Sequence, residues 1–166
     1  MTLSIREAVT ADGSAIRDLH LASIEGLAGS AYTDAQVDAW AHERDPDGYP
    51  IDSPQTYFVV AERGDSLVGF GWTKPDADDY FECDVDGEIT AVYVSPDATR
   101  EGVGSRIYAE LERYAREAGV NSLGLWASLN AVTFYEAQDY NRVTRHTLEF
   151  SDGVEGDVVE MRKSLS

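Results

Sequence analysis

The segment 88–106, EITAVYVSPDATREGVGSR, holds the residue types best suited to binding a charged ligand. Strand-forming residues end at a proline, Gly102 and Gly104 follow, and a helical pattern begins at once. Glycines let the backbone approach a ligand closely, and the unpaired amides at a helix start attract anions such as phosphate. Arg100 and Arg106 can add positive charge. We therefore predict an anion site here, although a tight turn between a strand and a helix would use the same two glycines.

Two well-known phosphate loops do not match this segment. A Walker loop ends in Gly-Lys-Ser or Gly-Lys-Thr, and no such ending follows Gly104. The dinucleotide fingerprint has a third glycine three residues after the second, where this chain has Ile107. The segment therefore predicts anion binding without either of these nucleotide-binding patterns.

Seven strands and four helices are expected to position this segment. The strands are expected at residues 3–8, 56–62, 66–73, 87–95, 123–127, 143–150 and 158–163. The helices are expected at residues 12–27, 33–42, 103–118 and 130–138. Their order, βααββ-β-α-β-α-ββ, mixes hairpins with strand-helix-strand crossovers, so the predicted fold class is α+β with a mixed sheet.

Three local patterns support these boundaries. Thr33 and Gln36 form the capping-box pattern at the start of the second helix. The helix at 103–118 repeats an apolar residue every four positions and ends before Gly119, which suits a left-handed cap. Gly64 suits the positive φ of a tight hairpin between the second and third strands. These signals predict where the chain turns.

Length and composition favour one domain over residues 1–166. Apolar residues make up 43% of the chain, which is enough for a core and excludes wholesale disorder. No apolar run approaches the roughly 18 residues of a membrane span, and the first residues form no apolar signal segment, so no membrane association is expected. The single cysteine, Cys83, offers neither a disulfide nor a zinc spacing, which predicts no metal site and a reduced, cytoplasmic setting.

The chain carries 13 basic and 31 acidic side chains, a formal charge of −18. Binding to nucleic acid needs clustered basic residues, so no nucleic-acid partner is expected. The acidic residues are spread along the chain, and Lys74 and Lys163 are its only lysines. This composition resembles that of proteins from salt-loving microbes, so we expect a halophilic surface. The alternative is that the carboxylates attract a cationic substrate, such as a polyamine or a lysine-rich peptide.

Two motifs resemble those of the GNAT superfamily of N-acetyltransferases. PDATREGVGS at 96–105 is similar to the acyl-CoA signature Arg/Gln-x-x-Gly-x-Gly/Ala, which follows a strand. NAVTFYEAQDY at 130–140 is similar to an Asn followed by Phe-Tyr-Glu-x-x-Gly-Phe. The element order matches the family over nearly all of the chain, and residues 32–41 are similar to a bacterial branch of small members. Two departures stand out: Thr99 replaces the Arg or Gln, and Asp139 replaces the second motif's glycine.

The resemblance implies a GNAT-type fold, with a mixed, largely antiparallel central sheet flanked by helices. It also implies acetyl-CoA as co-substrate, bound like an extra strand along a splayed edge of the strand at 87–95. Main-chain groups of Val92 and Val94 would hold the pantetheine arm, with the Val92 amide facing the thioester carbonyl, and Asn130 would bind from the next helix. The expected pyrophosphate loop is Thr99, Arg100, Glu101, Gly102, Val103, Gly104 and Ser105.

The resemblance further implies direct acetyl transfer, in a ternary complex, to a small-molecule or peptide amine. Glu88 is expected to remove the proton of the amine, directly or through water. Its offset of eleven residues from Thr99 matches the catalytic Glu of histone-acetylating members, and its parity with Val92 predicts that both face one cavity. Tyr135 is expected to protonate the departing thiolate. Without the resemblance, Glu88 would be a solvated carboxylate and Tyr135 a packing residue.

Tyr32, Trp40 and Trp72 lie in segments that usually form the acceptor site of such proteins. His20, beside the apolar stripe of the first helix, could line the same pocket or help as a base. Packing alone would also explain all four residues. An aromatic, acidic pocket would suit a cationic amine. A second interpretation of the chain is a non-catalytic GNAT-fold module that binds an acyl-CoA or a metabolite. A homodimer, paired through the last hairpin, is a further family-level expectation.

Overall fold

The computed structural model describes residues 2–27, 29, 31–41 and 45–165. Its strands are β1 (Leu3–Glu7), β2 (Tyr57–Arg63), β3 (Ser66–Lys74), β4 (Gly87–Val94), β5 (Ser122–Ser128), β6 (Asn141–Ser151) and β7 (Val154–Ser164). Its α-helices are α1 (Gly13–Leu27), α2 (Asp34–Trp40), α3 (Val103–Glu117) and α4 (Val132–Ala137). The predicted order of strands and helices is confirmed. Residue 42, the predicted end of the second helix, lies outside the described residues.

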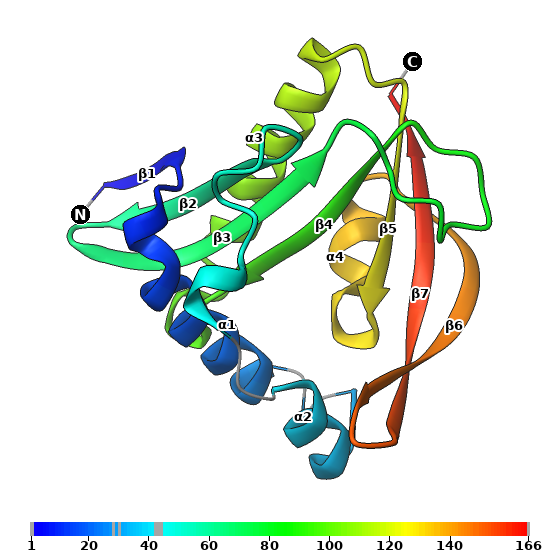
Figure 1. Cartoon of the computed structure of the whole chain (residues 1–166), viewed down its shortest axis with the longest axis horizontal. Helices are drawn as coiled ribbons and strands as arrows, with labels where there is room; N and C mark the ends of the chain where they lie inside the picture. The colour runs from blue at the N-terminus through cyan, green and yellow to red at the C-terminus, as the bar shows by residue number, and fades with distance from the viewer. Residues whose placement is uncertain (1, 28, 30, 42–44, 166) are drawn as a thin grey trace.

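The seven strands form one sheet in the order β1-β2-β3-β4-β5-β7-β6. Neighbouring strands are antiparallel except for β4 and β5, which are parallel. These two strands pair only at Gly87 with Leu123 and at Glu88 with Gly124, and then diverge, as Figure 1 shows. The predicted mixed, largely antiparallel sheet is confirmed, and its one parallel junction is open along most of its length.

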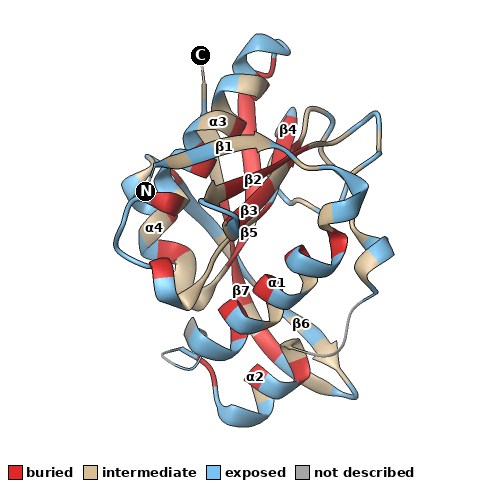
Figure 2. Cartoon of the chain, turned by 90° about the vertical axis from the view of Figure 1, so that its left-hand side faces the viewer, coloured by how far each residue is buried: buried red, intermediate tan, exposed pale blue. Residues whose placement is uncertain are grey.

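Helices cover both faces of the sheet, and the buried residues concentrate on the central strands and on the inner sides of the helices (Figure 2). α3 and α4 pack on one face, where Ile107 and Leu125 belong to the main core. α1 packs on the other face, where Ile16 lies with Phe58 and Phe70. α2 continues this second layer toward β6 and β7. No helix of the described residues is long and apolar enough to span a membrane.

The local signals at the element ends are confirmed. The Thr33 hydroxyl accepts a hydrogen bond from the Gln36 amide at 3.2 Å, and the Gln36 side chain accepts one from the Thr33 amide at 2.9 Å. Gly64 and Gly119 have φ of 62° and 84°, as the hairpin and the helix cap require. The apolar stripe of α3 faces the core, because every fourth residue from Val103 is buried.

The final hairpin is longer than predicted. β6 and β7 each contain 11 residues, and the turn between them is Asp152-Gly153, with φ of 50° and 78°. Positive φ at both central residues is typical of the tight turn that an Asp-Gly pair favours. The prediction placed the turn at residues 151–156, so its first strand stopped short of the turn and its second strand began too late.

β4 contains a bulge that reverses one sequence-based expectation. Ile89 and Ala91 pair with successive residues of β3, which leaves Thr90 between them as an extra residue. Because side chains alternate between the faces of a strand, this extra residue moves Glu88 onto the face of Ala91 and away from the face of Val92. The predicted common face of Glu88 and Val92 is therefore wrong, since sequence parity does not account for a bulge.

Candidate active site

A first cavity of about 320 Å³ lies where β4 and β5 diverge. It is lined by Ser23, Ile24, Trp40, Val92, Tyr93, Val94, Ala98, Thr99, Arg100, Gly102, Val103, Gly104, Ser105, Ser128, Asn130, Ala131, Phe134 and Tyr135. These include every residue predicted to contact acetyl-CoA except Glu101. The Glu101 carboxylate instead forms an ion pair with Arg63 at 2.6 Å.

The edge of β4 that faces β5 presents free main-chain groups. The Ser95 amide donates a hydrogen bond to the Val68 carbonyl of β3 at 2.8 Å. Because backbone groups alternate between the two edges of a strand, those of Val92 and Val94 point to the opposite edge, toward β5. β5 pairs with β4 only near the start of β4 and does not reach them. An extended ligand can therefore add to this edge as a further strand.

The loop before α3 can bind an anion with its main chain. Arg100 and Gly102 are in the left-handed region, with φ of 65° and 78°, and such turns gather amides into a concave site. The first helical hydrogen bond runs from the Arg106 amide to the Gly102 carbonyl at 3.1 Å, so the three preceding amides have no acceptor within α3. Among the described residues, no side chain caps α3 and no acidic residue lies in its first turn. The positive end of the helix dipole is thus available to an anion.

The two glycines of this motif are required for different reasons. A Cβ at Gly102 would meet no heavy atom within 4 Å, so the positive φ of this residue is what favours glycine. A Cβ at Gly104 would lie 3.3 Å from Phe134 Cε1 and 3.4 Å from Val94 Cγ2. Gly104 therefore permits the close packing of α3 against α4 and β4.

A second cavity of about 290 Å³ adjoins the first. Six residues line both cavities: Trp40, Val92, Tyr93, Ser128, Ala131 and Tyr135. The second cavity is also lined by Tyr32, Thr90, Ala91, Trp126, Ala127, Leu148, Glu149, Phe150 and Val158. Tyr32 and Trp40, two of the predicted acceptor residues, therefore meet at this cavity.

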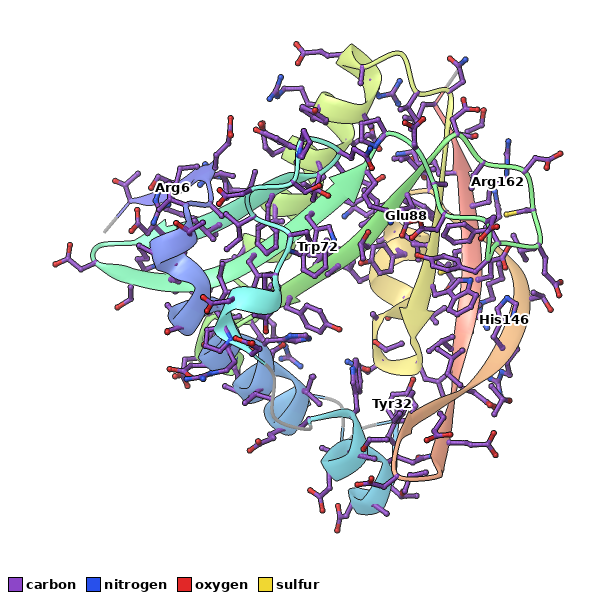
Figure 3. The ribbon with its side chains drawn as sticks, viewed as in Figure 1. Arg6, Tyr32, Trp72, Glu88, His146 and Arg162 are labelled. Carbon is purple, nitrogen blue, oxygen red and sulfur yellow. The ribbon has the colours of Figure 1, made fainter. Side chains whose placement is uncertain are left out.

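Tyr32 joins the segment before α2 to the far side of the second cavity (Figure 3). Its hydroxyl donates to the Asp157 carbonyl of β7 at 2.6 Å and accepts from the Leu129 amide at 2.9 Å. Its ring lies edge-to-face against Trp40 and Phe150, with centroid distances of 5.6 and 5.5 Å. Tyr32 thus fixes the aromatic wall that α2 and β6 form.

Two polar side chains that line the cavities, Asn130 and Tyr135, can each form a further hydrogen bond with a ligand. Asn130 Oδ1 is buried and has no hydrogen-bond partner among the described residues, which is costly unless a ligand or water donates to it. Tyr135 is 6% exposed. Burial and, to a smaller extent, the neighbouring Tyr93 raise the pKa of Tyr135, so its hydroxyl keeps its proton at neutral pH.

Glu88 lies outside both cavities, at the end of β4 that still pairs with β5 (Figure 3). Its side chain is 1% exposed and is not a solvated strand-end carboxylate. The carboxylate accepts hydrogen bonds from the Asp78 amide at 2.9 Å, from the Thr90 hydroxyl at 3.1 Å and from the Tyr80 hydroxyl. Lys74 Nζ lies 3.5 Å from Oε1. Because Thr90 lines the second cavity, its hydroxyl connects Glu88 to that space.

His20 and Trp72 belong to the layer between α1 and the sheet, and neither lines the first or the second cavity. His20 Nδ1 lies 3.0 Å from the Tyr49 hydroxyl, and the His20 ring packs on Tyr93 at a centroid distance of 4.3 Å. Trp72 stacks on Phe58 at 4.7 Å. Their predicted part in the acceptor pocket stays a prediction, and their contacts are those of packing residues.

Several lining residues of the second cavity carry no sequence signal. Thr90 reaches the cavity because of the bulge, and Trp126 and Ser128 lie on β5 with no motif around them. Glu149 and Phe150 approach from β6, which pairs with β7 and not with β5. Only the strand order brings these residues together, so only the known topology could have revealed them.

The chain has relatives among curated proteins. A mycothiol acetyltransferase of Streptomyces bingchenggensis is 29% identical over 153 residues, which cover 84% of this chain and 46% of that protein. This chain thus spans less than half the length of that relative. An uncharacterized N-acetyltransferase of Archaeoglobus fulgidus is 29% identical over 147 residues, which cover 84% of this chain and 94% of that protein.

Solved structures share the whole fold. A GCN5-related N-acetyltransferase from Rhodopseudomonas palustris superposes with a TM-score of 0.85 and 26% identity, over 99% of this chain and 97% of that one. The PaiA N-acetyltransferase from Thermoplasma acidophilum, solved with coenzyme A, superposes with a TM-score of 0.75 over 99% of both chains. At 18% identity, this second likeness shows the fold alone. The model of the acetyltransferase (GNAT) family matches residues 21–140, and the chain therefore belongs to the GNAT family of acetyltransferases.

Proposed function

We propose that the chain is an acetyl-CoA-dependent N-acetyltransferase that acts directly on a primary amine of a small molecule or peptide. The observation that carries this proposal is the pair of adjoining cavities, which share Val92 and Tyr135 at their junction. One cavity has a free strand edge and an anion-binding loop, whereas the other is aromatic. This arrangement suits two substrates bound at once, end to end, as a ternary complex requires.

The residues of the first cavity fit acetyl-CoA, which supplies the acetyl group on a thioester. Val92 and Val94 offer main-chain groups to the pantetheine arm, and the Val92 amide donates to the thioester carbonyl oxygen, where negative charge develops. The amides from Arg100 to Ser105 bind the pyrophosphate. Asn130 Oδ1, buried without a partner among the described residues, accepts a hydrogen bond from the ligand. Thr99 adds no charge, so the amides of the loop and the charge of Arg100, which also lines this cavity, carry the binding.

A proton must leave the amine before nitrogen can form a bond to the acetyl carbon. We assign its acceptance to Glu88, acting through Thr90. Thr90 lines the second cavity, and its hydroxyl donates to Glu88 at 3.1 Å. In this proposal the hydroxyl takes the proton of the amine while it passes its own to the carboxylate. The relay through Thr90 takes the place of direct contact between Glu88 and the amine, because Glu88 lines neither cavity.

The departing sulfur must receive a proton at the junction of the cavities. Tyr135 lines both cavities, and a tyrosine hydroxyl carries its proton at neutral pH. It can therefore donate a proton to the thiolate as the carbon–sulfur bond breaks. The hydroxyl makes no hydrogen bond to another described residue, so it is free to turn toward the sulfur.

Initial-rate kinetics test this function directly. Coenzyme A release is followed with a thiol reagent while acetyl-CoA and a primary amine are varied together. A ternary complex predicts intersecting double-reciprocal lines, whereas parallel lines would indicate a covalent acetyl-enzyme. Saturable acetyl-CoA binding without release of coenzyme A from any amine would instead identify a non-catalytic binding module.

The Glu88→Gln variant tests the route of the proton. We expect kcat to fall at least about tenfold while acetyl-CoA affinity stays within about twofold of the wild type. Glu62→Gln is the matched control, because Glu62 pairs with Arg6 at 3.1 Å and lines neither cavity. Unfolding free energies are measured for both variants. An unchanged kcat in folded Glu88→Gln protein would remove Glu88 from the mechanism.

A further inference from the structure

We infer that the acceptor is a primary amine on an apolar, aromatic-sized body that carries no anionic group. This inference rests on the proposed function, since it names the substrate class that the second cavity would take. Three properties of the cavity wall carry it: the wall is aromatic, its charge is negative, and no basic side chain among the described residues lines it.

Aromatic rings from five separate segments line the second cavity, namely α2 with the residues before it, β4, β5, α4 and β6. They are Tyr32, Trp40, Tyr93, Trp126, Tyr135 and Phe150. Several touch one another, since Trp40 lies 5.7 Å from Phe150 and 6.5 Å from Tyr93 between ring centroids. Rings held in this way form a wall that favours apolar groups, and their faces attract a cation. The body of the acceptor is therefore apolar, and its ammonium group can approach a ring face before it loses a proton.

Glu149 is the one charged residue among the described residues that line this cavity, and it is exposed to solvent. Its Oε2 accepts a hydrogen bond from the Gly153 amide at 3.2 Å, and no described basic side chain pairs with it. Its partner across the hairpin is Glu155, a second carboxylate. An uncompensated negative charge beside aromatic rings attracts an ammonium ion and repels a carboxylate.

Two further carboxylates lie directly behind the wall. Glu88 is bonded to the lining residue Thr90 at 3.1 Å. Glu160 pairs across the sheet with Trp126, so their side chains share a face, and it is fully buried. His146 stacks on Trp126 at 4.5 Å and bonds to Glu160 at 2.8 Å. The field in the cavity therefore comes from carboxylates on more than one side.

Two basic side chains on the strands around this cavity, Lys74 of β3 and Arg145 of β6, are already paired. Lys74 pairs with both Asp78 and Glu88, so one positive charge faces two negative ones. Arg145 pairs with Asp157 at 3.2 Å. An amino acid or a phosphorylated amine would thus place its anion in an aromatic cavity with no basic partner among the described lining residues, whereas an ammonium ion there would lie beside Glu149. A polyamine is also disfavoured, because its second ammonium would lie against apolar residues such as Leu148 and Val158.

A matched set of acceptors tests the inference: phenethylamine, phenylalaninamide, phenylalanine and putrescine. Phenylalaninamide has nearly the size of phenylalanine but carries no carboxylate. Comparing the two compounds therefore separates the effect of the negative charge from the effect of size. We expect kcat/KM for phenethylamine and phenylalaninamide to exceed that for phenylalanine and for putrescine at least about tenfold. Acetylation of phenylalanine or putrescine as efficient as that of phenethylamine would overturn the inference and leave the proposed function intact.

Substitution of Glu149 tests the source of the selectivity. Glu149→Gln should raise KM for phenethylamine several-fold, and Glu149→Arg should reverse the preference in favour of phenylalanine, with acetyl-CoA affinity unchanged in both. Glu155→Gln is the matched control, since Glu155 lies opposite Glu149 but does not line the second cavity. Equal KM values in wild type, Glu149→Gln and Glu155→Gln would contradict the role of Glu149.

Amine binding separates failure of the inference from failure of the function. The four compounds are titrated calorimetrically into protein saturated with coenzyme A. Binding of phenethylamine but not phenylalanine, without any turnover, would support the inference and overturn the proposed function. Absence of binding by every compound, or tighter binding of phenylalanine, would overturn the inference.

Discussion

The two cavities adjoin but are built in opposite ways. The first is formed mainly by one continuous stretch, residues 92–105, and it offers main-chain groups: a free strand edge and the amides of a loop and a helix start. The second is formed by side chains from α2, β4, β5, β6 and β7, which only the sheet brings together. A common ligand can thus be held by backbone geometry, while the side chains of the other cavity can vary with the acceptor.

This contrast predicts that substitutions separate into two groups. Changes at backbone positions of the first cavity should affect acetyl-CoA binding, and changes at side chains of the second should affect the amine. Substitution of Tyr135, which lines both cavities, should leave the affinities for acetyl-CoA and for the amine unchanged but should slow the chemical step.

The largest effect is expected at that junction. Tyr135→Phe should lower kcat about a hundredfold, because the departing sulfur loses its proton donor, while acetyl-CoA affinity stays within about twofold. The control is Tyr114→Phe, which removes a hydroxyl from a ring stacked on Tyr57 at 4.1 Å, away from both cavities. Steady-state kinetics with calorimetry of acetyl-CoA binding measure both quantities. A kcat that matches the control would assign proton donation elsewhere.

A tenfold effect is expected at the loop of the first cavity. Gly102→Val places a β-branched residue at a φ of 78°, so the loop must rearrange and its amides move. We expect the acetyl-CoA dissociation constant to rise at least about tenfold, equivalent to about 1.4 kcal/mol. Gly48→Ala is the control, because a Cβ there would meet only Asp45 Cβ at 3.8 Å. Unaltered affinity in Gly102→Val would mean that this loop does not bind the anion.

A smaller effect, confined to the second cavity, is expected from Tyr32→Phe. This change leaves the Leu129 amide and the Asp157 carbonyl without their shared hydroxyl, which should lower the free energy of unfolding by about 1 kcal/mol. The KM for the amine should rise, whereas acetyl-CoA affinity should not change. Urea unfolding and kinetics provide the measurements. Equal losses of amine and acetyl-CoA affinity would show that the two cavities are not independent.

The smallest effect is expected at Glu160, which anchors the 75–86 loop beside the second cavity. It is a loss of folding stability at mildly acidic pH. Burial acts to raise the pKa of Glu160, but hydrogen bonds from Cys83, from the Glu82 amide and from His146 outweigh it and lower this pKa to about 2. A lowered folded-state pKa stabilises the fold above the unfolded pKa of 4.5, and this stabilisation is lost as the pH falls toward 2.

The expected loss is about 0.4 kcal/mol at pH 4.5, and it grows as the pH falls further. Unfolding free energies of wild type and Glu160→Gln are compared from pH 7 to pH 3. The difference between the two proteins should shrink with falling pH, because the variant lacks the titrating group. A difference that is constant over this range would contradict the assignment.

The same contrast explains what could be predicted from the sequence. Gly102, Gly104 and their neighbours form a contiguous motif whose spacing is preserved in the fold, so their place at the first cavity could be predicted. The stripe of α3 and the capping box at Thr33 were likewise predictable, because each depends on residues within one or two helical turns.

The parts that escaped prediction depend on pairing between distant strands. The bulge at Thr90 exists only in relation to β3, and it placed Glu88 on the unexpected face. Glu149 reaches the second cavity only because β7 separates β6 from β5. The stacking of Trp72 on Phe58 likewise depends on the pairing of β2 with β3. Predicting a cavity that is lined by side chains therefore requires the strand order of the sheet. A site formed by the main chain can be recognised from a short stretch of sequence.

The central claim is that the first cavity binds acetyl-CoA through its main chain. Calorimetric titration of acetyl-CoA into the wild type and Gly102→Val tests it most directly, in about 2 M KCl so that the charge of −18 is screened. We predict saturable binding at one site in the wild type and at least tenfold weaker binding in the variant. Folded wild-type protein that binds no acetyl-CoA, or a variant that binds it equally well, would contradict the account.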